Sequence, residues 1–92
     1  MTDELNDIKQ LISDGNTQIA IERLVNFITK STIQKDWAYY LMGNAFRKQG
    51  NWQGALNSYQ EAIQINPESP AADARAMVMD ILNFYNKDMF NQ

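Results

Sequence analysis

The sequence contains neither cysteine nor histidine among its 92 residues. Without cysteine there are no disulfide frameworks and no thiol nucleophiles, and without histidine the commonest general base and metal ligand is missing. None of the serines stands in a sequence typical of an activated nucleophile. We therefore predict a protein that is not an enzyme and that holds no cofactor and no metal.

Basic charge and long apolar runs are also scarce. Eight basic residues face eleven acidic ones, for a net charge of −3, and the basic residues are scattered apart from the pair Arg47–Lys48. Nucleic-acid-binding proteins usually concentrate basic residues in one patch. No segment approaches the roughly 20 apolar residues of a membrane span, and the acidic start at 1–4 is unlike a signal peptide. We expect a cytoplasmic protein that binds neither nucleic acid nor membrane.

What the sequence does contain is helical periodicity along almost its whole length. Apolar residues recur at steps of three and four, and no segment alternates as a strand does. We predict an all-α domain of five helices. The first ends at Gly15-Asn16 and the second is closed by the polar residues 29–32. The third and fourth cover about 34–49 and 52–65, separated by a turn at Gly50-Asn51 that tolerates left-handed backbone, and the fifth begins at Pro70. A chain of this size forms one small domain, so surface grooves are expected rather than deep pockets.

Polar residues mark where three of these helices begin. Thr2 is expected to cap the first helix, and Ser31 with Gln34 matches a capping box for the third. Ser69 followed by Pro70 predicts an N-cap serine with proline at the first position of the fifth helix.

The helix-turn-helix unit occurs twice, at a spacing of 35 residues. Gly15, Asn16 and Ala20 match Gly50, Asn51 and Ala55, and Leu24 and Phe27 match Tyr59 and Ala62. A repeat of this length is typical of a helical array in which each unit packs on the next.

Residues 36–69 resemble a tetratricopeptide repeat over its full length. The positions that carry the resemblance are Tyr39, Met42, Gly43, Phe46, Gly50, Ala55, Tyr59, Ala62 and Pro67. Gly43 and Ala55 are small where two helices cross closely, while Phe46 and Tyr59 fill the space beside the crossing. The resemblance implies two helical hairpins in a right-handed superhelical stack, like the small stand-alone tetratricopeptide proteins of bacteria.

Residues 1–35 are interpreted as a degenerate repeat and residues 70–92 as a capping helix with its tail. Two registers are open for the first helix. A spacing of 35 places Ile8 opposite Gly43, whereas a spacing of 34 places Leu5, Ile8 and Ile12 opposite Tyr39, Met42 and Phe46, with Lys9 opposite Gly43. The second register fits the packing better. Neither provides a small residue at the crossing, so this hairpin is expected to be looser.

The resemblance also implies a binding function on the concave face of the stack. In the well-formed repeat the family's groove positions are Trp37, Tyr40, Asn44, Arg47 and Lys48. Trp, Tyr and Arg are the residue types most enriched among interface hot spots. The alternative is structural: Tyr40 and Asn44 belong to the framework of ordinary repeats, and Trp37 lies against the preceding helix. Trp52 is interpreted as a core residue.

We therefore predict an adaptor, monomeric or weakly dimeric, that binds a protein or peptide on this face. The family's two-carboxylate clamp is not expected, because only Asn44 and Arg75 correspond to it and Tyr40 replaces its lysine. An acidic peptide near Arg47, Lys48 and Arg75 remains an option.

The fifth helix supports a second hypothesis. Ala74, Val78, Ile81, Leu82 and Tyr85 form its inward stripe, and it carries further apolar residues at Met77, Met79, Phe84, Met89 and Phe90. Either Phe84, Met89 and Phe90 fold back to complete the core, or this helix mediates homo-oligomerisation, which would make the protein structural.

Overall fold

The computed structural model describes residues 1–90, with side chains as far as Phe84. Five α-helices make up the described chain, and no strand occurs within it. They are α1 (Asp3–Ser13), α2 (Thr17–Lys30), α3 (Lys35–Lys48), α4 (Trp52–Ile65) and α5 (Ala71–Phe90). The predicted all-α fold class is confirmed, and the bounds of α4 are those expected.

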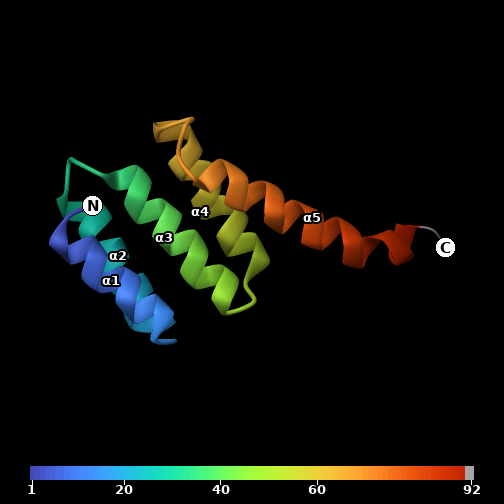
Figure 1. Ribbon diagram of the computed structural model, residues 1–92, viewed down its shortest axis with the longest axis horizontal. Helices are drawn as coiled ribbons and strands as arrows, with labels where there is room; N and C mark the ends of the chain where they lie inside the picture. Colours follow the sequence, from blue (N-terminus) through green and yellow to red (C-terminus); the bar gives the residue numbers. More distant parts are fainter. Residues whose placement is uncertain (91–92) are drawn as a thin grey trace.

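The helices form two antiparallel hairpins followed by a single long helix (Figure 1). In the view of Figure 1, α1, α3 and α5 lie in the nearer layer and α2 and α4 behind them. Each helix is amphipathic, so consecutive helices bury their apolar faces against one another. The C-terminal part of α5 projects beyond the body of the molecule.

Both hairpin turns end their first helix in the same way. Gly15 and Gly50 have φ of 89° and 78°, a conformation that costs glycine little. The following amides, of Asn16 and Asn51, donate to the carbonyls of Leu11 and Phe46 at 2.8 and 2.9 Å. These are the hydrogen bonds of the Schellman motif, so the two turns superpose at the spacing of 35 residues.

In the second hairpin, α3 and α4 cross closely because Gly43 has no side chain. A Cβ at Gly43 would overlap the ring of Tyr59, which is fully buried. Ala55 and Ala62 of α4 are also fully buried, and the rings of Tyr39 and Phe46 pack beside them. The predicted close crossing is confirmed.

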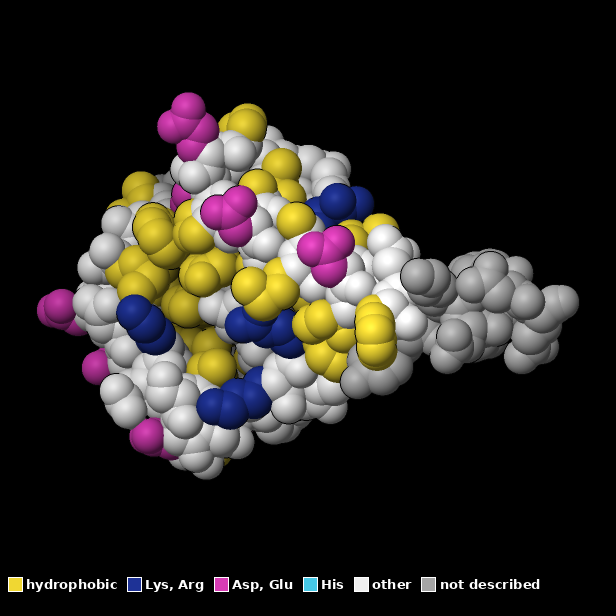
Figure 2. Space-filling view, turned by 45° about the vertical axis from the view of Figure 1, so that its right-hand side comes forward, with side chains coloured by type: hydrophobic (Ala, Val, Ile, Leu, Met, Phe, Trp, Pro, Cys, Tyr) yellow, Lys and Arg dark blue, Asp and Glu magenta, His cyan; other side chains and the backbone are white. Residues whose placement is uncertain are grey.

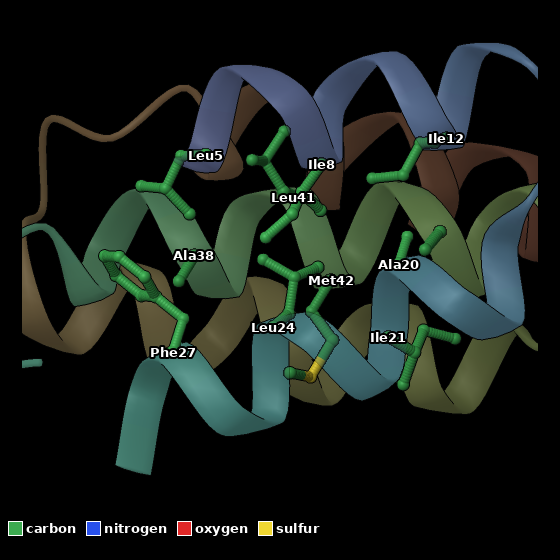
Figure 3. Packing of buried hydrophobic residues seen from close by; sticks show 11 residues of the cluster. Leu5, Ile8, Ile12, Ala20, Ile21, Leu24, Phe27, Ala38, Leu41 and Met42 are labelled. Carbon is green, nitrogen blue, oxygen red and sulfur yellow. The ribbon is translucent and has the colours of Figure 1, made fainter. Parts of the chain in front are cut away.

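The first hairpin shows that the preferred register of 34 was wrong. Because the turns superpose at 35, Ile8 takes the place of Gly43, and Leu24 takes the place of Tyr59. Ile8 and Leu24 are both fully buried in one cluster, so a medium-sized pair fills the volume that glycine and tyrosine fill in the second hairpin. Figure 3 shows the side chains of α1 and α2 converging on Leu41 and Met42 of α3. As expected, α1 packs less extensively on α2 than α3 does on α4.

The helix α5 caps the array over its first half only. Ala71, Ala74 and Val78 are buried against α4, and Leu82 packs at the edge of their cluster. Phe84 is 74% exposed, so its predicted return to the core is wrong. The predictions for Tyr85, Met89 and Phe90 lie outside the described side chains.

Of the predicted helix starts, one is confirmed and two are corrected. The Thr2 hydroxyl accepts from the amide of Leu5 at 3.1 Å. Ser31 and Gln34 form no capping box: the Ser31 hydroxyl bonds the backbone of Ile33, and Gln34 adopts a left-handed φ of 56°. The Gln34 side chain instead accepts from the amide of Thr2 at 2.9 Å, which ties α1 to the start of α3.

The third start, at α5, is displaced by one residue. The helix begins at Ala71 rather than at Pro70, and the Ser69 hydroxyl accepts from the amide of Ala71 at 3.1 Å.

Candidate peptide-binding groove

A groove of about 630 Å³ runs along α3, between α1 and the start of α5. Its size is in the range of ligand sites in proteins. Five of the six predicted site residues line it: Trp37, Tyr40, Asn44, Arg47 and Lys48. The other lining residues are Met1, Lys9, Ile12, Ser13, Leu41 and Pro70.

The groove combines an apolar floor with a basic edge. Three basic residues line it, Lys9, Arg47 and Lys48, and none of its lining residues in the described chain is acidic. Figure 2 shows an apolar hollow on this face with Lys and Arg side chains around it. The groove is therefore basic although the whole chain carries a net charge of −3.

Aromatic rings form the floor. Trp37 meets Tyr40 edge-to-face with ring centroids 5.9 Å apart, and Tyr40 lies 6.2 Å from the ring of Tyr59. Trp37 and Tyr40 are half-buried, and both also pack against the core cluster shared by α1, α2 and α3. Both interpretations of Trp37 therefore apply, because it packs against the preceding helices and also exposes part of its surface to the groove.

Asn44 is anchored to the core by Tyr59. The Tyr59 hydroxyl donates to the Asn44 side-chain oxygen at 2.6 Å. Burial raises the pKa of Tyr59 to about 12, against a smaller opposing effect of the nearby Arg47 charge, so this hydroxyl is a donor at neutral pH. The amide N–H groups of Asn44 are then its remaining polar atoms, and both are donors suited to a peptide carbonyl.

Two of the three cations, Lys48 and Arg47, differ in how firmly the protein holds them. The Lys48 ammonium donates to the carbonyls of Ile12 and Ser13 at 2.9 and 3.2 Å, so it caps the C-terminal end of α1. The Arg47 guanidinium lies 3.7 Å from the sulfur of Met77, a weak acceptor. Lys48 is thus mainly structural, whereas Arg47 retains most of its capacity to bind a carboxylate.

The sequence reasoning missed the contribution of α1. Lys9, Ile12 and Ser13 occupy the positions of Asn44, Arg47 and Lys48 at a spacing of 35 residues. The correct register would therefore have identified them. Arg75 is half-buried on α5 and is not among the residues that line the groove, so the structure does not bring it to this site.

Two paired helical hairpins, a glycine at the helix crossing and a groove along the first helix of each hairpin define a helical-repeat protein. The family model of the tetratricopeptide repeat matches residues 37–69. The chain is also similar to the Bacteroides fragilis protein BF1650, known from a solution NMR structure. The two are 59% identical over 99% of this chain and 92% of that one, with a TM-score of 0.90.

The chain belongs to the tetratricopeptide-repeat family. The repeat indicates a protein–protein interaction module in general terms. The comparison with curated proteins produced no match.

None of the described helices is long and apolar enough to cross a membrane. The described side chains, as far as Phe84, also contain no group of three or more carboxylates that could hold a metal ion.

Proposed function

We propose that this protein is a non-catalytic adaptor that binds a peptide or protein segment with acidic groups in the groove along α3. The observation that carries the proposal is the lining of the groove. It has an apolar, aromatic floor edged by three basic side chains, and none of the described residues that line it is acidic. An apolar side chain of the ligand would pack on Trp37 and Tyr40, a carboxylate would pair with Arg47 or Lys9, and Asn44 would donate to a peptide carbonyl.

The ligand chemistry follows from these groups. An arginine guanidinium pairs well with a carboxylate because its planar fork matches the two oxygens. Pairs at such a half-open site are screened by salt, so the charges would provide specificity and association rate, and the aromatic floor most of the affinity.

The test is a titration read by Trp37 fluorescence, after Trp52→Phe makes Trp37 the single tryptophan reporter. A library of short peptides is selected on this protein, and the selected peptides are titrated into it and into an Arg47→Glu variant. We expect selection of peptides that combine an acidic residue with an aromatic or large aliphatic one. Binding to Arg47→Glu should be weaker by about tenfold or more.

A matched control is present in the chain itself. Arg75→Glu makes the same change of residue and charge outside the groove, and it should leave the affinity within about twofold. Equal losses for Arg47→Glu and Arg75→Glu would mean that overall charge, rather than the groove, attracts the peptide. Selection of basic peptides would contradict the proposal.

A second candidate function is homo-oligomerisation through α5. It is favoured by two large apolar side chains on this helix, Met77 and Phe84, which are 53% and 74% exposed. Surface apolar residues grouped on one helix face are typical of association sites. That the protein is bacterial and cytoplasmic remains a prediction from the sequence.

A further inference from the structure

A second surface, on α5, carries acidic residues beside apolar ones, whereas the groove carries basic residues. Asp73, Met77, Asp80 and Phe84 follow one another at steps of four, three and four, so they lie along one stripe of the helix. All four are exposed. We call this surface the α5 stripe. Between residues 71 and 84 the only basic residue is Arg75, two steps from Asp73 and therefore on another side of the helix.

The C-terminal half of this stripe lies beside the start of α4, where the body of the molecule ends. The helix α5 has 20 residues and its neighbour α4 has 14, so at about 1.5 Å per residue α5 is longer by about 9 Å. Figure 1 shows the free end of α5 standing clear of the other helices. Asp80, Ile81 and Phe84 line a shallow apolar hollow opposite Trp52.

The groove and the α5 stripe are complementary in charge and in apolar character. The groove offers aromatic rings edged by Lys9, Arg47 and Lys48, and the stripe offers Met77 and Phe84 edged by Asp73 and Asp80. An amphipathic helix lying in an apolar groove is a common mode of recognition. Within one molecule only the first half of the stripe approaches the groove, through the contact of Met77 with Arg47.

We propose that the α5 stripe is itself a ligand for the groove of a second copy of this chain. In the complex Phe84 packs on the rings of Trp37 and Tyr40, and the Asp80 carboxylate pairs with Arg47. The inference rests on the proposed function, because it uses the same groove. It adds a regulatory consequence: self-association and binding of an acidic peptide exclude one another, so ligand dissociates the assembly.

The test measures the mass of the full chain by light scattering on size exclusion, from about 10 µM to about 1 mM. We expect a mass that rises with concentration and falls with salt, because exposed charge pairs are screened. Phe84→Ser and Asp80→Lys should each weaken association by about tenfold or more. The controls are Ile19→Ser and Glu61→Lys, which make comparable apolar-to-polar and acidic-to-basic changes at exposed positions of α2 and α4.

A mixing experiment identifies the two surfaces. Arg47→Glu spoils the groove and the double variant Asp80→Lys/Phe84→Ser spoils the stripe, so each protein alone should be monomeric. A mixture has one intact groove and one intact stripe, and it should form a one-to-one complex. Circular dichroism checks that both variants keep the helical signal of the wild type.

Each outcome decides the inference. A wild-type chain that stays monomeric at the highest concentration refutes it, and so does association that survives Arg47→Glu, since α5 would then pair with something other than the groove. Failure of the mixture to associate also refutes it. Peptide titration by Trp37 fluorescence separates this result from the proposed function: a monomeric chain that binds acidic peptides retains the adaptor function and loses only self-docking.

Discussion

Replacing Gly43 by alanine tests the packing of the second hairpin most directly. At an exposed helix position this change should stabilise the protein by about 0.5–1 kcal/mol, since alanine is the better helix former. Here the new methyl group would overlap the Tyr59 ring. That ring is fully buried and fixed by its hydrogen bond to Asn44, so it has no room to turn aside.

The overlap should therefore exceed the gain in helix propensity. Overpacking a core typically costs about 1–3 kcal/mol, and a methyl group directed at a fixed ring belongs at the upper end. We expect a net loss of roughly 1–2 kcal/mol in the free energy of unfolding. For a domain of this size that is a fall in melting temperature of about 4–16 °C.

Two companion variants isolate the cause. Tyr59→Leu introduces the side chain that the first hairpin has at this place, and in that background Gly43→Ala should be neutral or stabilising. Ala76→Gly, at an exposed position of α5, measures helix propensity in this chain and should cost about 1 kcal/mol. The assay is urea unfolding followed by circular dichroism. Stabilisation by Gly43→Ala in the wild-type background would refute the close crossing.

Three further predictions concern the hydrogen bonds of Tyr59, Lys48 and Thr2. The pKa of Tyr59 is raised from 10.0 to about 12, so the folded state holds this proton more tightly. The stabilisation is complete below pH 10 and should decline by up to about 2.7 kcal/mol as the pH rises through 12. Urea unfolding of wild type and Tyr59→Phe at several pH values measures it, and a difference independent of pH would contradict it. Lys48→Met removes the donor to two carbonyls at the end of α1 and should cost about 0.5–1 kcal/mol; amide hydrogen exchange should show the loss mainly in α1. Thr2→Val removes the cap of α1 and should cost about 1 kcal/mol, measured by thermal melting, whereas Thr2→Ser should cost little.

The sequence by itself determined the helices, the two hairpins and the family. Apolar spacing at 3.6 residues and glycines at the turns are local requirements, and each can be recognised without knowing which residues lie opposite. For the same reason, five of the six predicted site residues line the groove: they share one helix, α3, whose periodicity places them on one face.

Features that depend on two segments at once followed from the packing of the helices and could not be predicted from either segment alone. The first hairpin accommodates Ile8 at the crossing because the smaller Leu24 stands where the second hairpin has a tyrosine. Periodicity left two registers open, and the packing of these two side chains is consistent with the register of 35. The capping box at Ser31 was displaced because the Gln34 side chain finds the amide of Thr2, a partner distant in sequence.

The same dependence explains the remaining site residues. The Lys48 ammonium donates to the carbonyl groups at the end of α1, and Arg75 lies outside the groove. The position of each side chain follows from how neighbouring helices pack on α3 and α4. Helix periodicity can be recognised within one segment, whereas the contacts of a side chain depend on which residues of other segments lie near it in the fold.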